Sequence, residues 1–187
     1  MSVSIRALAA CLFAAFACFT GGVLAEQSVP WVLVDTSALR LSVMRGEEVL
    51  ATFENISIGS NGTASAKRVG DERTPLGDYT IREIRTSDRF NRFLALDSPS
   101  MEDARRALGD GRIDARVFER IRRARQRGEF PPQDTPLGGH LGLHGLGEGS
   151  QEIHALFNWT NGCIALTNEQ IDALAQQIRV GTLVRIR

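Results

Sequence analysis

The stretch Thr160-Asn161-Gly162-Cys163 places a glycine directly before a cysteine, and His144-Gly145 lies 19 positions upstream of that cysteine. His144 ends the apolar run of residues 141–144, which is typical of a short strand. The loop that follows is long enough to return Cys163 beside that strand. Because an imidazole can accept the proton of a thiol, this pair favours a cysteine nucleophile with a histidine base.

The thiol of Cys163 is expected to stand alone in the mature protein. Apart from Arg6, the first 25 residues carry no charge, and their apolar run ends in small residues that fit a signal-peptidase site. We therefore predict a signal peptide over residues 1–25, with an apolar part too short for a stable membrane span. Cys11 and Cys18 would be removed with it, so Cys163 is either a buried apolar residue or a reactive thiol.

The remaining chain has the size and charge of one globular domain. About 160 residues can bury a sizeable core, and we place a single domain over residues 29–187. Without Arg6, the chain has 21 basic and 22 acidic residues, so its net charge is close to zero. This balance gives no support for binding to nucleic acid or to an anionic membrane surface.

Alternating apolar residues and short apolar runs predict a domain that is mainly β. Strand patterns occur over residues 31–35, 39–43, 49–53, 79–81, 93–96 and 183–186. Between residues 100 and 128 the period becomes helical, which predicts an insertion with helices over residues 101–108 and 113–127. A further helix is expected after the cysteine, because Thr167 and Gln170 form a capping box before an apolar stripe.

One face of the second inserted helix is strongly basic. It carries Arg116, Arg120, Arg123 and Arg127. Such a row is either a solvated helix face or a rim that attracts the carboxylates of an anionic substrate. The sequence leaves both interpretations open.

The reaction that these residues favour is acyl transfer through a thioester. A free thiol is only slightly ionised near neutral pH, so His144 would act as the base that activates Cys163. No Asp or Asn lies beside His144, and the Gly145 carbonyl is the candidate that fixes the imidazole tautomer. Gly162 permits a backbone conformation closed to other residues, which would let backbone N–H groups near the cysteine converge on an oxyanion.

The pattern His-Gly followed by Ser/Thr-x-Gly-Cys resembles the signature of L,D-transpeptidases with the YkuD-type catalytic domain. A second segment, Gly70-Asp71-Glu72-Arg73-Thr74-Pro75-Leu76-Gly77-Asp78-Tyr79, is similar to the Gly-Asp-x-x-Thr-Pro-x-Gly-x-Tyr segment of that family. The resemblance implies a β-sandwich with inserted helices over residues 29–187. It also implies that Cys163 is the nucleophile and His144 the general base, with no cofactor and no metal.

The resemblance further implies action on the peptide stems of bacterial peptidoglycan. The enzyme would attack the bond between a diamino acid, such as diaminopimelate, and the terminal D-alanine, leaving the acyl group on Cys163. The acceptor stays open: an amine of a second stem gives a cross-link, water gives carboxypeptidase activity, and an outer-membrane lipoprotein is a third partner. Together with the signal peptide, this substrate implies a periplasmic enzyme of cell-wall and cell-shape maintenance.

Two positions depart from the usual motif. Asn161 stands where most members have histidine, and Ala165 where most have arginine or asparagine. The Trp-Thr-x-Gly-Cys-Ile-Ala version resembles a subgroup, in which Asn161 would support the site and Trp159 and Thr160 would contact substrate. His140 is a further candidate for the cleft. With alanine at position 165, a stem carboxylate would need another cation, and the arginine-rich helix is the candidate.

Two alternatives to this function stay open. His140, His144, His154 and Cys163 would together suit zinc, although the glycines around residue 139 argue against the helix that an i, i+4 histidine pair needs. The departures from the usual motif also allow a non-catalytic module that binds the cell wall.

Overall fold

The computed structural model describes residues 29–187, so the predicted signal peptide lies outside the described residues. The strands are β1 (Trp31–Asp35), β2 (Arg40–Arg45), β3 (Glu48–Glu54), β4 (Thr63–Ala64), β5 (Thr74–Pro75), β6 (Gly77–Ser87), β7 (Asn91–Leu96), β8 (Gly142–His144), β9 (Ile164–Ala165) and β10 (Leu183–Ile186). The helices are α1 (Met101–Gly109), α2 (Ala115–Gln126), α3 (Gln151–Leu156) and α4 (Asn168–Ala175). The mainly-β prediction is confirmed, and none of these four helices is long and apolar enough to cross a membrane.

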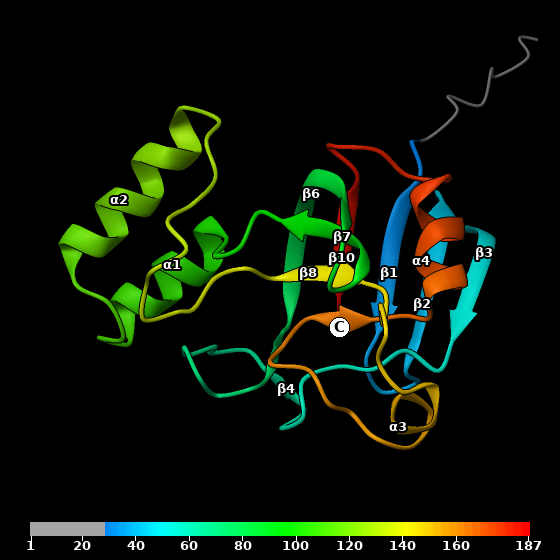
Figure 1. Ribbon diagram of the computed structural model, residues 1–187. Coiled ribbons are helices and arrows are strands. Elements are labelled where there is room, and N and C mark those ends of the chain that lie inside the picture. The colour runs from blue at the N-terminus through cyan, green and yellow to red at the C-terminus, as the bar shows by residue number, and fades with distance from the viewer. Residues whose placement is uncertain (1–28) are drawn as a thin grey trace, which may run out of the picture.

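Eight of the strands form one continuous sheet in the order β3-β2-β1-β10-β6-β7-β8-β9. The chain starts with the antiparallel strands β1 to β3, and its last strand, β10, inserts between β1 and β6 (Figure 1). β8 and β9 lie at the far edge and pair in parallel, which requires the long crossover that contains α3. β4 and β5 form a separate parallel pair.

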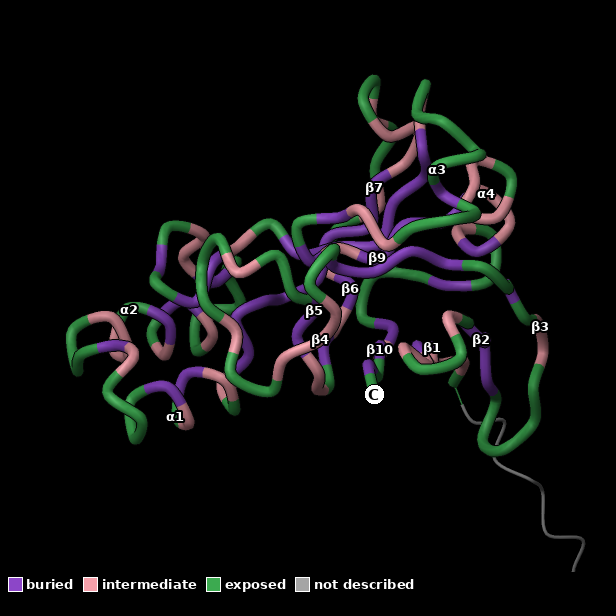
Figure 2. Tube along the Cα trace, turned by 90° about the horizontal axis from the view of Figure 1, so that it is seen from below, coloured by how far each residue is buried: buried purple, intermediate pink, exposed green. Residues whose placement is uncertain are grey.

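The two halves of the sheet curl around one hydrophobic core. Apolar side chains from both halves, including Val32 on β1 and Leu94 on β7, meet there. α4 covers this core with the buried Ile171 and Leu174, and it starts at the predicted capping box. Figure 2 shows the buried residues along the central strands and the exposed residues on the turns. The alternation in the sequence thus corresponds to core-facing positions.

α1 and α2 form a helical hairpin beside the sheet, in the insertion predicted over residues 100–128. Their apolar faces pack on each other through a second, smaller core that includes Ile121 and Leu137. α2 begins at Ala115 rather than at Ile113, because Asp114 caps the helix and Ile113 belongs to this second core. In Figure 1 the hairpin stands apart from β1–β3 and α4.

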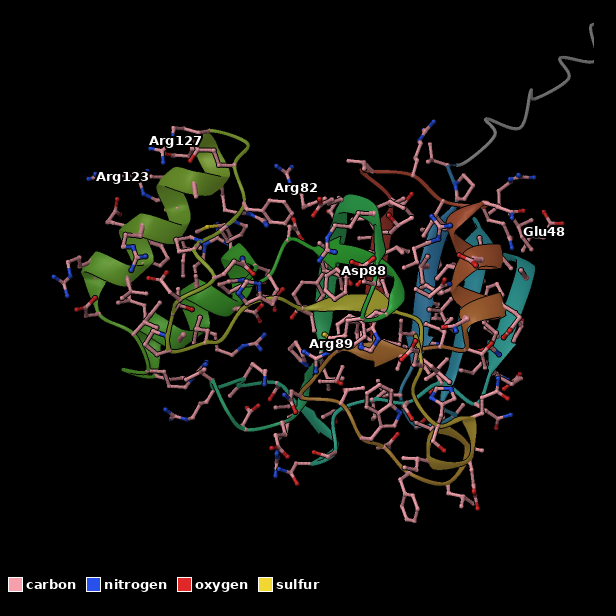
Figure 3. All side chains as sticks on the ribbon, viewed as in Figure 1. Glu48, Arg82, Asp88, Arg89, Arg123 and Arg127 are labelled. Carbon is pink, nitrogen blue, oxygen red and sulfur yellow. The ribbon has the colours of Figure 1, made fainter. Side chains whose placement is uncertain are left out.

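The basic face of α2 is turned to solvent and locally neutralised. Figure 3 shows Arg123 and Arg127 on the side of α2 that faces away from the sheet. Exposed arginines of this face pair with nearby acidic residues: Arg120 with Asp134, Arg123 with Glu119, and Arg127 with Glu129. The solvated-face interpretation therefore fits α2, whose exposed Arg120, Arg123 and Arg127 pair with acids of their own surroundings.

The inserted hairpin holds the β4–β5 loop (residues 65–73) in place. The Arg106 side chain on α1 donates to the Ser65 carbonyl. Arg112, in the turn between the two helices, donates to the Lys67 carbonyl at 3.0 Å. The position of Lys67 is therefore determined by the insertion as well as by the sheet.

Candidate active site

β8 and β9 bring His144 and Cys163 to one face of the sheet. In this parallel pair Leu143 lies opposite Ile164, and His144 lies opposite Ala165. Leu143 and Ile164 are fully buried in the core. Because successive side chains of a strand alternate between its two faces, His144 and Cys163 both belong to the opposite face. Two residues that are distant in the chain are thus carried by adjacent strands.

The imidazole of His144 has a defined tautomer. Its Nδ1 lies 2.7 Å from the Gly145 carbonyl oxygen, which can only accept, so Nδ1 carries the proton and Nε2 keeps its lone pair. Burial lowers the pKa of His144, while the Gly145 carbonyl acts against this effect and the charge of Arg89 adds to it. The imidazole is therefore neutral at pH 7 and able to accept a proton.

Three aromatic rings surround this imidazole. The ring of Phe90 lies 4.2 Å from it between centroids, Phe93 stacks at 6.1 Å, and Trp159 approaches edge-on at 5.8 Å. The rings account for the burial of His144, which is 2% exposed. Trp159 is thus a wall of the site.

His154 supports Trp159 from behind. The polar sequence of this segment suggests an exposed loop, but the structure has the short helix α3 there, and His154 is buried on it. The indole N–H of Trp159 donates to Nδ1 of His154 at 3.4 Å. The Ser57 hydroxyl also lies 3.4 Å from the His154 carbonyl oxygen. These contacts draw the helix inward, which hydropathy along the sequence does not reveal.

The four residues of the zinc alternative do not gather into one site. Within residues 29–187, no three His, Cys, Asp or Glu side chains lie together in a way that could hold a metal ion. His140 and His144 also lack the helix that would align them, because His140 has a left-handed backbone before the strand β8.

The thiol of Cys163 is partly buried and protonated in the resting site. It donates to the His140 carbonyl at 3.4 Å. Burial raises the pKa of the thiol to about 11, while the Gly142 N–H and the charge of Lys67 act in the opposite direction. Within residues 29–187 no hydrogen bond joins the sulfur to His144, so the pair rests as a neutral thiol and a neutral imidazole. Catalytic hydrogen bonds commonly tighten only when substrate is bound.

Thr160 shapes the turn before Cys163. Its hydroxyl accepts a hydrogen bond from the Gly162 N–H at 3.1 Å and donates to the Cys163 carbonyl at 2.6 Å. Thr160 is 3% exposed, so its hydroxyl is used within this turn, and a contact of Thr160 with substrate stays a prediction. The Gly162 N–H is paired within this turn, and a role of Gly162 toward an oxyanion stays a prediction.

Asn161 and His140 lie at the surface of the site. The Asn161 side chain is exposed and makes no hydrogen bond within the part of the chain that the structure describes. The His140 side chain is also exposed, and the residue contacts the thiol through its backbone carbonyl. Roles of these two side chains toward a substrate stay predictions.

Gly162 brings the cysteine turn into contact with the second motif segment, residues 70–79. Its carbonyl accepts from the Thr74 hydroxyl at 3.0 Å, and the same hydroxyl accepts from the Gly59 N–H at 2.8 Å. Gly162 has φ 122, and a Cβ atom there would lie 2.6 Å from the Arg73 carbonyl oxygen. Only glycine fits this close approach.

Lys67 is a candidate functional residue that the sequence patterns did not single out. Asp71 accepts hydrogen bonds from the Lys67 ammonium and from two backbone N–H groups of the β4–β5 loop. The Lys67 Cε lies 3.5 Å from the point that a Cβ on Gly162 would occupy. A cation is thus held beside the turn that carries Cys163. In the sequence, the i, i+4 spacing of Lys67 and Asp71, just before and within the second motif segment, was the pattern that could have indicated this ion pair.

Replacing Lys67 by methionine is expected to raise the pKa of the Cys163 thiol further, because a positive charge that favours the thiolate is lost. The rate of alkylation by iodoacetamide near pH 9 should fall by about threefold to tenfold. Lys67→Arg keeps the charge and is the matched control, with a rate close to that of the wild type. Equal rates in all three proteins would show that Lys67 does not act on the thiol.

Comparison with known proteins agrees with this geometry. The sequence model of the L,D-transpeptidase catalytic domain, YkuD, matches residues 29–186. The fold is similar to that of Pgp2, a helical cell shape determining protein from Campylobacter jejuni, with a TM-score of 0.58, 20% identity, and coverage of 87% of this chain and 48% of that chain. It is also similar to Bd1075 from Bdellovibrio bacteriovorus, with a TM-score of 0.55, 20% identity, and coverage of 86% and 48%.

This chain therefore spans about half the length of those two chains. A search among curated proteins found no match. The family match covers the whole sheet, both motif segments and the strands that carry His144 and Cys163. The chain thus belongs to the family of L,D-transpeptidase (YkuD) catalytic domains.

Proposed function

We propose that this protein is an exported L,D-transpeptidase that acts on the peptide stems of peptidoglycan, with Cys163 as nucleophile and His144 as general base. The observation that carries the proposal is the position of both residues on one face of β8 and β9, in a chain of the L,D-transpeptidase catalytic domain family. The bond that breaks joins the diamino acid of the stem to the terminal D-alanine.

In the first half-reaction the thiol proton moves to Nε2 of His144 while the sulfur attacks the carbonyl carbon of the diamino acid. The neutral resting pair favours proton transfer during the attack over a preformed ion pair. The Gly142 N–H and the charge of Lys67 favour negative charge on the sulfur. The imidazolium then protonates the D-alanine nitrogen, the C–N bond breaks, and the acyl group remains on Cys163 as a thioester.

In the second half-reaction an amine of another stem attacks the thioester carbonyl, and His144 accepts its proton. The C–S bond breaks, and the sulfur regains a proton from the imidazolium. Water in place of the amine yields a trimmed stem by the same steps. In both cases the Gly145 carbonyl keeps the other proton on Nδ1, so that Nε2 remains the reacting nitrogen.

The test is incubation of the purified domain with tetrapeptide muropeptides, followed by mass analysis of the products and of the protein. We expect release of D-alanine and a thioester adduct on Cys163. Cross-linked dimers would identify an amine acceptor, and tripeptide stems would identify water as the acceptor. Adding a lipoprotein as a third substrate tests attachment to protein. Binding of the muropeptides without any D-alanine release would instead support the non-catalytic wall-binding module.

We also propose that the enzyme works in the periplasm. The support is the uncharged, apolar stretch of residues 7–25 after Arg6, which ends in a small-residue cleavage pattern. Expression of the full chain in a Gram-negative host, followed by fractionation and N-terminal sequencing, tests this. Uncleaved protein in the cytoplasmic fraction would contradict it.

A further inference from the structure

The turn between β6 and β7, residues 88–90, is pressed against the segment that follows the predicted base. A Cβ atom on Gly145 would lie 2.7 Å from the Phe90 carbonyl oxygen, and one on Gly147 would lie 2.1 Å from the Arg89 carbonyl oxygen. The Asn168 side chain at the start of α4 accepts a hydrogen bond from the Gly147 N–H and donates one to the Gly147 carbonyl. Backbones at this distance leave the turn little freedom, so Arg89 is presented at a fixed place beside His144.

The Arg89 side chain is an unengaged cation at this place. It is exposed, and within residues 29–187 its guanidinium makes no hydrogen bond or ion pair. It lies over the ring of Phe90, 4.8 Å from the centroid, and the His144 imidazole also lies beside that ring, at 4.2 Å between centroids. Figure 3 shows Arg89 in the part of the molecule that holds the sheet, apart from Arg123 and Arg127 at α2.

Two other arginines of the β6–β7 hairpin are already engaged. Arg85 also lies over an aromatic ring, that of Phe93 at 5.0 Å, but it contacts Glu83 at 3.6 Å. Arg92 contacts Asp172 at 2.7 Å. Ala165, two residues after the cysteine, is fully buried and offers no charge. Among the arginines of the β6–β7 hairpin, Arg89 is therefore the one that remains available to an anion, and it lies beside the imidazole.

The chemistry of the leaving group decides which anion would meet this cation. His144 must protonate the nitrogen of the departing D-alanine, so that nitrogen lies next to the imidazole during acylation. The carboxylate of D-alanine is attached to the carbon beside this nitrogen. A leaving group docked on His144 thus extends its carboxylate over the surrounding surface, where Phe90 and Arg89 lie.

Building on the proposed function, we propose that Arg89 binds the terminal carboxylate of the donor stem and thereby selects stems that end in a free D-alanine. A guanidinium suits this role because its planar N–H groups can bind a carboxylate in a bidentate manner. The cation–π contact with Phe90 keeps the guanidinium beside the imidazole before substrate binds. The contact also places the scissile carbonyl one residue before the chain end, which restricts cleavage to the terminal bond.

The experiment compares two donor peptides, a tetrapeptide stem and the same stem with its terminal carboxylate converted to an amide. For each donor, kcat and KM for release of the terminal residue are measured with the wild type, Arg89→Gln and the matched control Arg85→Gln. The control removes a guanidinium that also covers an aromatic ring but already contacts a carboxylate. Glutamine keeps the apolar stem of the side chain over the ring in each variant.

We expect the wild type and Arg85→Gln to prefer the free carboxylate by about tenfold or more in kcat/KM, which is about 1.4 kcal/mol. In Arg89→Gln this preference should disappear, mainly through a higher KM for the acid donor, with little change for the amide donor. Arg89→Lys should recover part of the preference, because it restores the charge without the bidentate geometry.

The outcomes separate this inference from the function on which it rests. If the wild type releases no D-alanine, both the proposed function and the role of Arg89 fall. If the wild type is active but Arg89→Gln keeps the full preference for the acid donor, only the role of Arg89 falls. Loss of the preference in Arg85→Gln instead would overturn the assignment to Arg89 as well.

Discussion

Replacing Cys163 by serine is expected to abolish D-alanine release and leave the domain folded. A serine hydroxyl is much harder to deprotonate than a thiol, and His144 has only a backbone carbonyl, not a carboxylate, to strengthen it as a base. Activity should therefore fall by about a thousandfold or more, as for removal of other catalytic nucleophiles. Release of D-alanine from tetrapeptide stems measures the loss.

The fold of this variant should be nearly unchanged, because a hydroxyl is smaller than a thiol and can keep the hydrogen bond to the His140 carbonyl. The free energy of unfolding should stay within about 1 kcal/mol of the wild type. Cys163→Ala removes both the nucleophile and this hydrogen bond, and it is therefore the control for the contribution of the hydrogen bond to stability. Wild-type turnover in the serine variant would refute the thioester mechanism.

Replacing Gly162 by alanine is expected to damage both stability and activity. The new Cβ would lie 2.6 Å from the Arg73 carbonyl oxygen, and φ 122 is a conformation that residues with a side chain rarely adopt. Relief of this clash requires the cysteine turn and the second motif segment to separate. We expect a loss of about 2–4 kcal/mol in the free energy of unfolding. Displacement of Cys163 should lower kcat/KM by about a hundredfold in the protein that remains folded.

Gly111→Ala is the matched control for this variant. Gly111 also has a positive φ, of 67, but a Cβ there would meet no atom within 4 Å. This substitution should cost about 1 kcal/mol through the backbone alone and should leave activity intact. Chemical denaturation of both variants, with the same assay, measures the difference. Equal unfolding free energies would mean that the contact between Gly162 and Arg73 is not a constraint on the fold.

Local sequence patterns predicted a strand or a helix start correctly where the stabilising contacts join residues that are close in the sequence. The strands over residues 31–35 and 93–96 are short apolar runs, and such a run marks a buried strand without reference to any distant segment. The helices α1 and α4 start where Ser100 and Thr167 cap them, because a capping box joins residues three positions apart. The boundary of α2 was misplaced by two residues, since Ile113 is apolar for packing against the hairpin rather than for helix formation.

Features that depend on distant segments did not follow from local patterns. The burial of His154 comes from Trp159 and Ser57, which reach it from different parts of the chain. The pairing of the α2 arginines likewise follows from acids such as Asp134, outside the helix. In the sequence Thr160 is a polar residue of the motif. In the structure its hydroxyl makes two hydrogen bonds within the turn before Cys163, with the Gly162 N–H and the Cys163 carbonyl.

The sequence by itself determined the family and the mainly-β domain, because motif residues at set spacing and apolar patterns carry this information without any coordinates. The same motifs predict Cys163 and His144 as the reacting pair. Only the tertiary structure decided what surrounds that pair. The sheet places His144 and Cys163 on one face, the inserted hairpin holds Lys67 near the thiol, and the β6–β7 turn brings Arg89 over Phe90. Charges act on a reacting group through space, and their distance from it is set by packing between segments that the sequence keeps far apart.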